Sequence, residues 1–210
     1  MLSAASISPS AALRRIHAAA LKLFTETGAT RVNVSELAAA AGMARGTIYG
    51  NVPNLDSLFE DVAAQLAREM VDRVMRGFEG VDDPAHRMAI GIRQYIRRAH
   101  EEPPWGRFMH RFGLSLALLQ AVSASDPVDN MKAGIASGRY KIAPEQIPAM
   151  VCLVSGGTLA AMLPVLEGHA TWRDVGSETA ELILVALGIP RREAKGLARA
   201  PLPPLDDTPS

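Results

Sequence analysis

The sequence predicts an all-α fold in two parts, a small helical domain at 10–56 and a larger helical domain at 57–200. Apolar residues recur at helical spacing along most of the 210 residues, and glycine and proline separate the resulting segments. No stretch alternates apolar and polar residues for long enough to predict a sheet. The proline-rich end, 201–210, predicts a flexible tail.

The first two helices are predicted from their apolar faces and caps. Apolar residues share one face at 16–24, and Gly28 ends that helix. Asn33 is a natural N-cap for the next helix, and Glu36 three residues later completes a capping-box pattern. Gly42 ends this second helix in a left-handed conformation. The residues of its buried face are Val34, Leu37, Ala38 and Ala41.

A third, short helix begins near Ala44 and completes a helix-turn-helix over about 34–52. Ile48 and Val52 are its only expected core anchors. A helix this short, with two glycines, gains little from propensity or burial. Close approach to a DNA backbone is one explanation of this composition. The side chains expected to face outward are those of Arg45, Thr47, Tyr49 and Asn51.

These helices resemble the DNA-binding domain of the TetR (tetracycline-repressor-like) family of bacterial transcription regulators. The resemblance covers roughly the first sixty residues. Three positions depart from the family pattern: Ala44 replaces a capping Ser or Thr, Val52 replaces Phe, and Leu55 replaces Lys. A missing cap typically costs about 1 kcal/mol, and the missing lysine removes a phosphate contact, so we expect weaker or more salt-sensitive operator binding. The signature residues are Leu37, Ala38, Ala41, Gly42, Met43, Gly46, Thr47, Ile48 and Tyr49.

The resemblance and side-chain chemistry together predict the contacts with double-stranded DNA. Arg45 and Thr47, in the first turn of the recognition helix, reach base edges or phosphates, and Arg pairs well with guanine. Tyr49 and Asn51, at the flank of the recognition helix, are expected to form hydrogen bonds with phosphates or bases. Asn33 and the amides beside it hold a phosphate. The full set of predicted DNA-binding residues is Asn33, Ala44, Arg45, Gly46, Thr47, Tyr49, Asn51, Arg14 and Arg31.

The charge distribution agrees with one DNA-binding module. The formal net charge is zero, which argues against a general nucleic-acid coat. Residues 1–50 carry five basic and two acidic side chains, so the positive charge lies in the part that holds the motif.

Cysteine and hydropathy patterns predict a cytoplasmic protein. The single cysteine, Cys152, excludes an intrachain disulfide, and its apolar sequence neighbours predict a buried, inert thiol. No segment has about 18 uninterrupted apolar residues, and the N-terminus lacks a signal pattern, so neither a membrane span nor secretion is expected.

The larger domain is predicted as a series of helices. A long amphipathic connector at 55–78 comes first. Prolines at 103 and 104 are expected to stop the second helix, a polar loop is expected at 123–127, and the chain after Gly188 is expected to be broken by prolines. The helical segments after the connector are 84–100, 105–119, 129–136, 144–167 and 172–187.

The last two of these helices are apolar on more than one side and must be buried on more than one side. They could form the centre of a single-chain bundle. Alternatively, they meet a second copy as a four-helix interface, as the resemblance also implies. We favour this homodimer, with Val154 and Leu182 in the interface, because one short recognition helix reads too few base pairs to be selective.

The middle of the chain is rich in aromatic and methionine residues, which is typical of an apolar small-molecule site. Each residue alone is better explained as ordinary core, so the set predicts a region and not individual contacts. The five histidines are scattered, so no metal is expected. No phosphate loop or catalytic group predicts a cofactor or an enzyme. The predicted ligand-binding residues are Tyr95, His100, Trp105, Phe108, Met109, Phe112, Met131 and Met162.

Two functional classes follow. The first is a ligand-responsive dimeric regulator, a repressor released from a palindromic operator by a small apolar molecule. The second is a helical enzyme or ligand carrier that contains a helix-turn-helix as a packing element. The outward polar residues of the short helix favour the first class, because a packing element does not need them.

Overall fold

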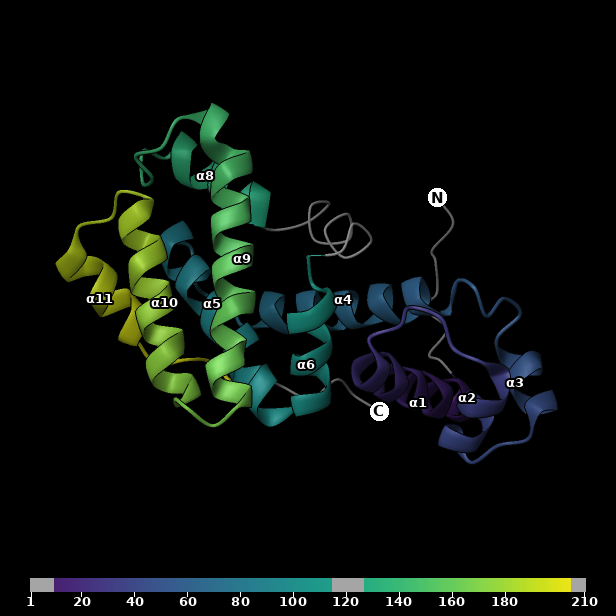
Figure 1. Cartoon of the computed structure of the whole chain (residues 1–210). Helices are drawn as coiled ribbons and strands as arrows, with labels where there is room; N and C mark the ends of the chain where they lie inside the picture. Colours follow the sequence, from purple (N-terminus) through teal and green to yellow (C-terminus); the bar gives the residue numbers. More distant parts are fainter. Residues whose placement is uncertain (1–9, 115–126, 205–210) are drawn as a thin grey trace, which may run out of the picture. The chain divides into compact units, whose positions relative to one another are not determined.

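The structure is a computed structural model that describes residues 10–114 and 127–204. The chain divides into two compact units, Met1–Ala63 (unit 1) and Ala64–Ser210 (unit 2), and the division falls inside one helix. Every regular element within the described ranges is a helix, which confirms the predicted all-α class (Figure 1).

Unit 1 contains three helices and the start of a fourth. They are α1 (Ala11–Thr27), α2 (Val34–Ala41), α3 (Arg45–Asn51) and the first residues of α4 (Leu58–Arg76). Phe24 of α1 packs edge-on against Phe59 of α4 with 5.2 Å between ring centroids. The small core closes around fully buried side chains, namely Ile16, Ala20, Phe24, Leu37 and Ile48.

The predicted helix ends of unit 1 are largely confirmed. Gly28 and Gly42 have φ of 73° and 62°, the left-handed conformation that favours glycine. Asn33 caps α2 by accepting a hydrogen bond from the Ser35 amide at 2.7 Å. The cap therefore uses the short Asn33 side chain, and the hydrogen bonds described at this end do not include the reciprocal bond from Glu36 that the capping-box pattern predicted.

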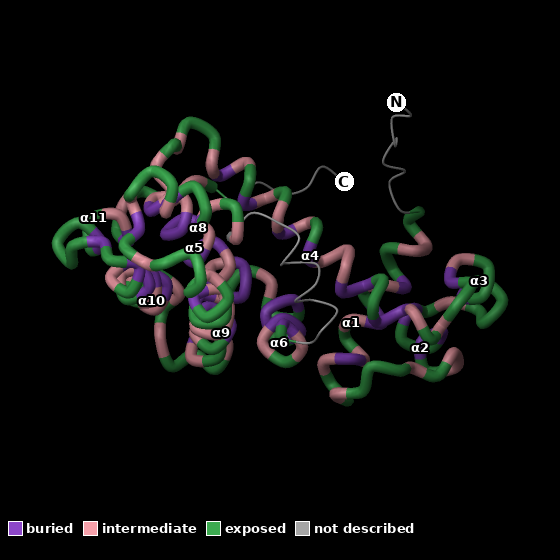
Figure 2. The backbone as a smooth tube through the Cα atoms, turned by 90° about the horizontal axis from the view of Figure 1, so that it is seen from above, coloured by how far each residue is buried: buried purple, intermediate pink, exposed green. Residues whose placement is uncertain are grey.

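Unit 2 is built around α5 (Pro84–Glu101), which packs against each later α-helix of the described residues. Figure 2 shows the buried positions of α5 among the neighbouring helices of this unit. Its core joins α5 to α8, α9, α10 and α11. The other elements are α6 (Pro103–Phe112), α8 (Pro127–Ala136), the short 3-10 helix η1 (Pro144–Gln146), α9 (Ile147–Leu166), α10 (Trp172–Ala186) and α11 (Arg191–Arg199).

Helix α5 ends at Glu101, before Pro103, as predicted, but α6 begins at Pro103 and not at Trp105. Proline fits the first helical turn because it lacks only an amide that this turn leaves unpaired. A further helix, α11, follows Pro190 where a broken chain was expected; only Ala194 and Ala198 of this short charged helix are buried, so its apolar signal is weak. Most of the predicted loop at 123–127 lies outside the described residues, as does the end of the predicted 105–119 helix.

The side chains of α9 face in directions that the sequence neighbours did not reveal. Cys152 is exposed, so the predicted buried thiol is wrong. Leu153 is 49% exposed, whereas Val154 is 8% exposed and belongs to the core of the single chain, so Val154 is not the interface residue that the sequence predicted. Successive residues of a helix turn by about 100°, and apolar neighbours in sequence therefore point to different surroundings.

The segment Pro144–Leu166 is long and apolar enough to cross a membrane by length and composition alone, and 28% of its apolar 18-residue stretch is buried inside the structure. Ser155 and Thr158 interrupt its apolar run, which is why a criterion of uninterrupted apolar residues did not detect it. Such a helix is weak evidence of a span. Its low burial shows instead that much apolar surface of α9 is uncovered in a single chain.

A polar cluster joins the start of α5 to two distant segments. Asp83 accepts two hydrogen bonds from the Arg139 guanidinium, at 2.8 and 2.9 Å, and one from the Ala85 amide at 3.0 Å. Arg139 also donates to Glu193 of α11 at 2.7 Å. The bonds from Arg139 hold the pKa of Asp83 below its usual range. The charged form of Asp83 therefore stabilises the fold.

Replacing Asp83 with Asn keeps the helix cap but removes the charge. Because the pair is partly exposed, we expect the free energy of unfolding at neutral pH to fall by about 1 kcal/mol. A carboxylate with a lowered pKa contributes its stability above its unfolded pKa of about 4 and loses it as pH falls through the folded pKa, so the difference between Asp83→Asn and wild type shrinks in acid. Urea unfolding followed by circular dichroism at several pH values measures this. Asp82→Asn, at a fully exposed neighbour, is the control, and a difference that does not depend on pH contradicts the assignment.

Candidate nucleic-acid interface and ligand region

Helix α3 is anchored by very few side chains. Ile48 is fully buried and Val52, just after the helix, is 4% exposed, as predicted. The adjacent Tyr49 is 57% exposed. The remaining outward positions are exposed or half-buried, namely Arg45, Gly46, Thr47, Gly50 and Asn51. The helix thus presents a polar surface on a single apolar anchor.

Neither packing nor backbone conformation within the chain requires glycine at the two glycine positions of α3. A Cβ at Gly46 or Gly50 would meet no atom within 4 Å, and neither glycine has a positive φ. Their small size is therefore not required by packing within the chain. It leaves room for another molecule to approach the backbone. Ala44 makes no side-chain cap, so the amides of the first turn of α3 receive no hydrogen bond from it, as the sequence predicted.

Two further side chains position the motif. Asn51 donates to the Thr47 carbonyl at 2.9 Å and accepts from the Ser10 hydroxyl at 3.2 Å, which ties the end of α3 to the start of α1. Arg15 donates to the Ala41 carbonyl at 2.8 Å and so satisfies the end of α2. Sequence reasoning missed Ser10, although a serine before a helix is a recognisable N-cap. The predicted phosphate contacts Arg14 and Arg31 are exposed.

The residues predicted to bind ligand lie mainly on α5, α6 and α9. Tyr95 and Trp105 have ring centroids 5.9 Å apart, and Phe108 and Phe112 have centroids 5.2 Å apart. Met109 and Met162 are buried on α6 and α9. The structure does not bring the whole set together: Met131 belongs to the core cluster around α5 and α8, and His100 is exposed beside a different, arginine-rich cavity.

Within the described residues, buried polar atoms without a hydrogen-bond partner occur on α5, α6 and α9. They include the Gln94 amide of α5, the Trp105 indole Nε1 of α6 and the Thr158 hydroxyl of α9. The Gln94 amide faces Gly77, where a Cβ would lie 2.6 Å from Gln94 Nε2. Buried polar groups are normally paired, so each is a position where a bound molecule or water can contribute a bond. Sequence analysis did not name Thr158 or Gln94 as ligand-binding residues, because helical spacing does not show which buried polar atoms lack a hydrogen-bond partner.

A buried ion cluster connects this region to α4. Arg98 is 2% exposed, and its guanidinium lies over the Trp105 ring at 4.4 Å. It donates to Glu102 at 3.0 Å and lies 3.5 Å from Glu69 of α4. Arg73 of α4 also bonds Glu102. Burial lowers the pKa of Arg98; burial alone would raise the pKa of Glu102, but the bonds from both arginines outweigh it and lower that pKa.

We searched the part of the chain that the structure describes for side chains that could form a metal site. Within those residues, no group of three or more His, Cys, Asp or Glu side chains lies close enough to hold a metal ion. His110 instead lies 3.1 Å from the Leu159 carbonyl and joins α6 to α9.

Several solved structures have a fold similar to that of this chain. RolR in complex with resorcinol is 24% identical, with a TM-score of 0.68 over 93% of this chain and 96% of that one. FadR from Bacillus subtilis in complex with stearoyl-CoA is 19% identical, with a TM-score of 0.61 over 81% and 97%. A TetR family transcription regulator from Marinobacter aquaeolei VT8 is 18% identical, with a TM-score of 0.62 over 87% and 94%. Identities this low show the shared fold alone.

Family models match both parts of the chain. The model of bacterial regulatory proteins of the tetR family matches residues 16–62, and the tetracyclin repressor-like C-terminal domain matches residues 83–200. No curated protein matches the sequence. The C-terminal match alone covers more than half of the 210 residues. This chain therefore belongs to the TetR family of bacterial transcription regulators.

Proposed function

We propose that this chain is a dimeric transcriptional repressor that binds a palindromic operator and releases it when a small apolar molecule binds. The observation that carries the proposal is the surface of α3. Its polar side chains face outward around the single buried anchor Ile48, and Gly46 and Gly50 are not needed by packing within the chain. An enzyme or carrier that used this motif only for packing would need none of these features.

The uncovered apolar face of α9 supports a homodimer. Leu153 and Leu163 are 49% and 43% exposed, and Leu182 of α10 is 63% exposed. Between the two leucines of α9, a Cβ at Gly156 would meet nothing within 4 Å, so a second helix can approach closely there. Exposed apolar patches of this kind mark interaction surfaces. The same face of a second copy is the occupant that gives two symmetric recognition helices.

The effector site is proposed among α5, α6 and α9. Structures of two proteins with this fold contain an aromatic or a long-chain ligand, resorcinol in RolR and stearoyl-CoA in FadR. Trp105, Phe108 and Met162 supply apolar surface here, and the unpaired Trp105 indole supplies a donor for a polar group on the ligand.

Trp105 also provides a way for ligand binding to affect the DNA-binding unit. It stacks on Arg98, which reaches Glu69 of α4. Helix α4 runs without a break from Leu58 to Arg76, and its first residues Phe59 and Val62 are buried in unit 1. A ligand that shifts Trp105 changes the contact between Arg98 and α4, and thereby the recognition helices.

The operator is expected to be a pseudo-palindrome with half-site centres ~34–36 Å apart, because two recognition helices enter successive major grooves on one face of the duplex. Arg45→Ala weakens specific binding by about 1–3 kcal/mol and relaxes preference at one base step if Arg45 reads a base. Tyr49→Phe costs less, because one hydrogen bond is lost. Fluorescence anisotropy with operator and scrambled duplexes measures both. Operator affinity that is unchanged when Arg45 and Tyr49 are both replaced by Ala refutes the assignment of α3.

The dimer is tested at its most exposed leucine. Leu182→Glu places a charge in the proposed interface and is expected to give folded monomers, because leaving a charge unpaired on burial is costly. Ala133→Glu, at an exposed position of α8, adds the same charge outside the α9 and α10 face and is the control. Sedimentation velocity at micromolar concentration reports the state of each. A monodisperse monomer for the wild-type protein contradicts the model.

Effector binding is expected to be reciprocal with operator binding. A small apolar compound found by thermal-shift screening lowers operator affinity, and operator lowers the affinity for that compound by the same factor, typically about 5–150-fold. Trp105 fluorescence is expected to respond, while Trp172 contributes background. Titrating the compound with and without operator is the measurement; equal affinities in both titrations show that the site is not the regulatory one.

A further inference from the structure

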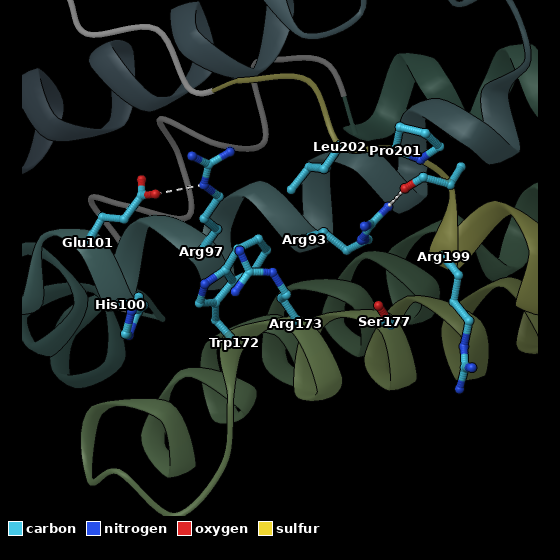
Figure 3. A pocket seen from close by; sticks show the side chains of 11 residues that line it. Arg93, Arg97, His100, Glu101, Trp172, Arg173, Ser177, Arg199, Pro201 and Leu202 are labelled. Carbon is cyan, nitrogen blue, oxygen red and sulfur yellow. Dashed lines mark hydrogen bonds and ion pairs between the residues drawn. The ribbon is translucent and has the colours of Figure 1, made fainter.

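Unit 2 holds a cationic cavity that the proposed repressor mechanism does not use. Its volume is about 660 Å³, and it lies among α5, α10, α11 and the segment 200–202 (Figure 3). Four arginines line it, namely Arg93, Arg97, Arg173 and Arg199, with a single acidic residue, Glu101. With His100 neutral, the lining carries a net charge of +3 in a chain whose net charge is zero.

Most of this charge has no acidic partner among the residues that the structure describes. Arg97 is paired with Glu101 at 2.7 Å. Across residues 10–114 and 127–204, the ion pairs include none for Arg93, Arg173 or Arg199. Figure 3 shows the Arg199 side chain pointing away from the other three arginines, so the charges that an anion in the cavity would neutralise most directly are those of Arg93 and Arg173.

Arg93 is the most informative of the four because it is buried. It is 8% exposed, and burial lowers its pKa. One nitrogen donates to the Ala200 carbonyl at 2.7 Å, and the side-chain stem packs over Gly176, where a Cβ would lie 3.6 Å from the Arg93 Cγ. A guanidinium has five N–H donors, so one hydrogen bond leaves most of them for another acceptor. A buried charge without a charged partner is costly to fold.

Trp172 holds two further arginines in place. The guanidinium carbons of Arg97 and Arg173 lie 5.5 and 4.5 Å from the centre of its ring. Figure 3 shows the Trp172 ring beside both side chains at the cavity. Stacking on an aromatic ring restricts the guanidinium, so less entropy is lost when it binds an anion.

We propose that this cavity binds a small organic polyanion with at least two carboxylate or phosphate groups. Guanidinium forks match the two oxygens of either group, and the cavity volume lies in the range of small-molecule sites, about 300–1,000 Å³. None of the four arginines belongs to the proposed apolar effector region; of the residues predicted for that region, only His100 lines this cavity. The proposal therefore stands or falls independently of the repressor mechanism.

The test is isothermal titration calorimetry of the full-length protein with citrate and with pyrophosphate at constant ionic strength. At least one probe is expected to bind saturably at one site per chain, and the stronger probe identifies the acidic group. Combining Arg173→Gln with Arg199→Gln is expected to weaken binding at least about tenfold, because two of the four arginines that line the cavity lose their charge. Both side chains are exposed, so this variant is expected to fold.

The matched control combines Arg191→Gln with Arg192→Gln. These exposed residues of α11 do not line the cavity, and the control has the same net charge as the double variant. Arg93→Gln, checked for folding by circular dichroism, tests the buried member. No saturable binding of either probe overturns the proposal, as does an equal loss in the control. If the cavity variant instead loses affinity for duplex DNA and neither probe binds, the surface serves nucleic acid and the proposal is also wrong.

Discussion

The contacts of the buried Arg98 guanidinium determine how α4, α5 and α6 pack together in unit 2. Three helices meet at this one side chain: it belongs to α5, stacks on Trp105 of α6 and pairs with Glu69 of α4. The side chains of Glu69 and Glu102 are 28% and 39% exposed, so removing one of them is expected to cost less than the about 3–5 kcal/mol typical of a fully buried pair. The end of α4 is therefore held to α5 and α6 by electrostatics that only a few geometries satisfy.

Such a cluster suits a helix that enters both units. An apolar contact tolerates sliding, whereas the Arg98 cluster with Glu69, Arg73 and Glu102 fixes the register of α4 on α5. In the proposed mechanism, the same cluster makes α4 sensitive to Trp105, since the aromatic ring and the carboxylates contact one guanidinium. Stability and proposed regulation thus rest on the same atoms.

The helix-turn-helix shows the opposite balance of forces. Helix α3 has one fully buried side chain and no side-chain cap at Ala44, and it is held by the hydrogen bond that the Ser10 hydroxyl donates to Asn51 rather than by a core of its own. Because so few side chains of α3 are needed for packing within the chain, its surface residues can be suited to binding another molecule. The exposed leucines of α9 and α10, at the proposed dimer face, are likewise not needed for packing within the chain.

The sequence by itself determined the helical class, the helix-turn-helix and most caps of unit 1, because these depend on residues within about four positions of one another. Gly28, Asn33 and Gly42 end or begin helices where the pattern placed them. Periodicity also identified Ile48 as an anchor. Local spacing is enough wherever a single face of a helix is buried.

Tertiary structure alone decided which side of an all-apolar helix is covered and which distant charges meet. In α9, apolar residues surround the helix, so nothing local distinguishes exposed Cys152 from buried Val154. The packing of helix α11 involves two buried alanines and the hydrogen bond that Arg139 donates to Glu193. Arg139 and Glu193 lie far apart in sequence. The arginine cavity likewise assembles Arg93, Arg173 and Arg199 from three helices. Burial and long-range ion pairs depend on the whole fold, because a residue's surroundings come from segments that its own neighbours in sequence do not encode.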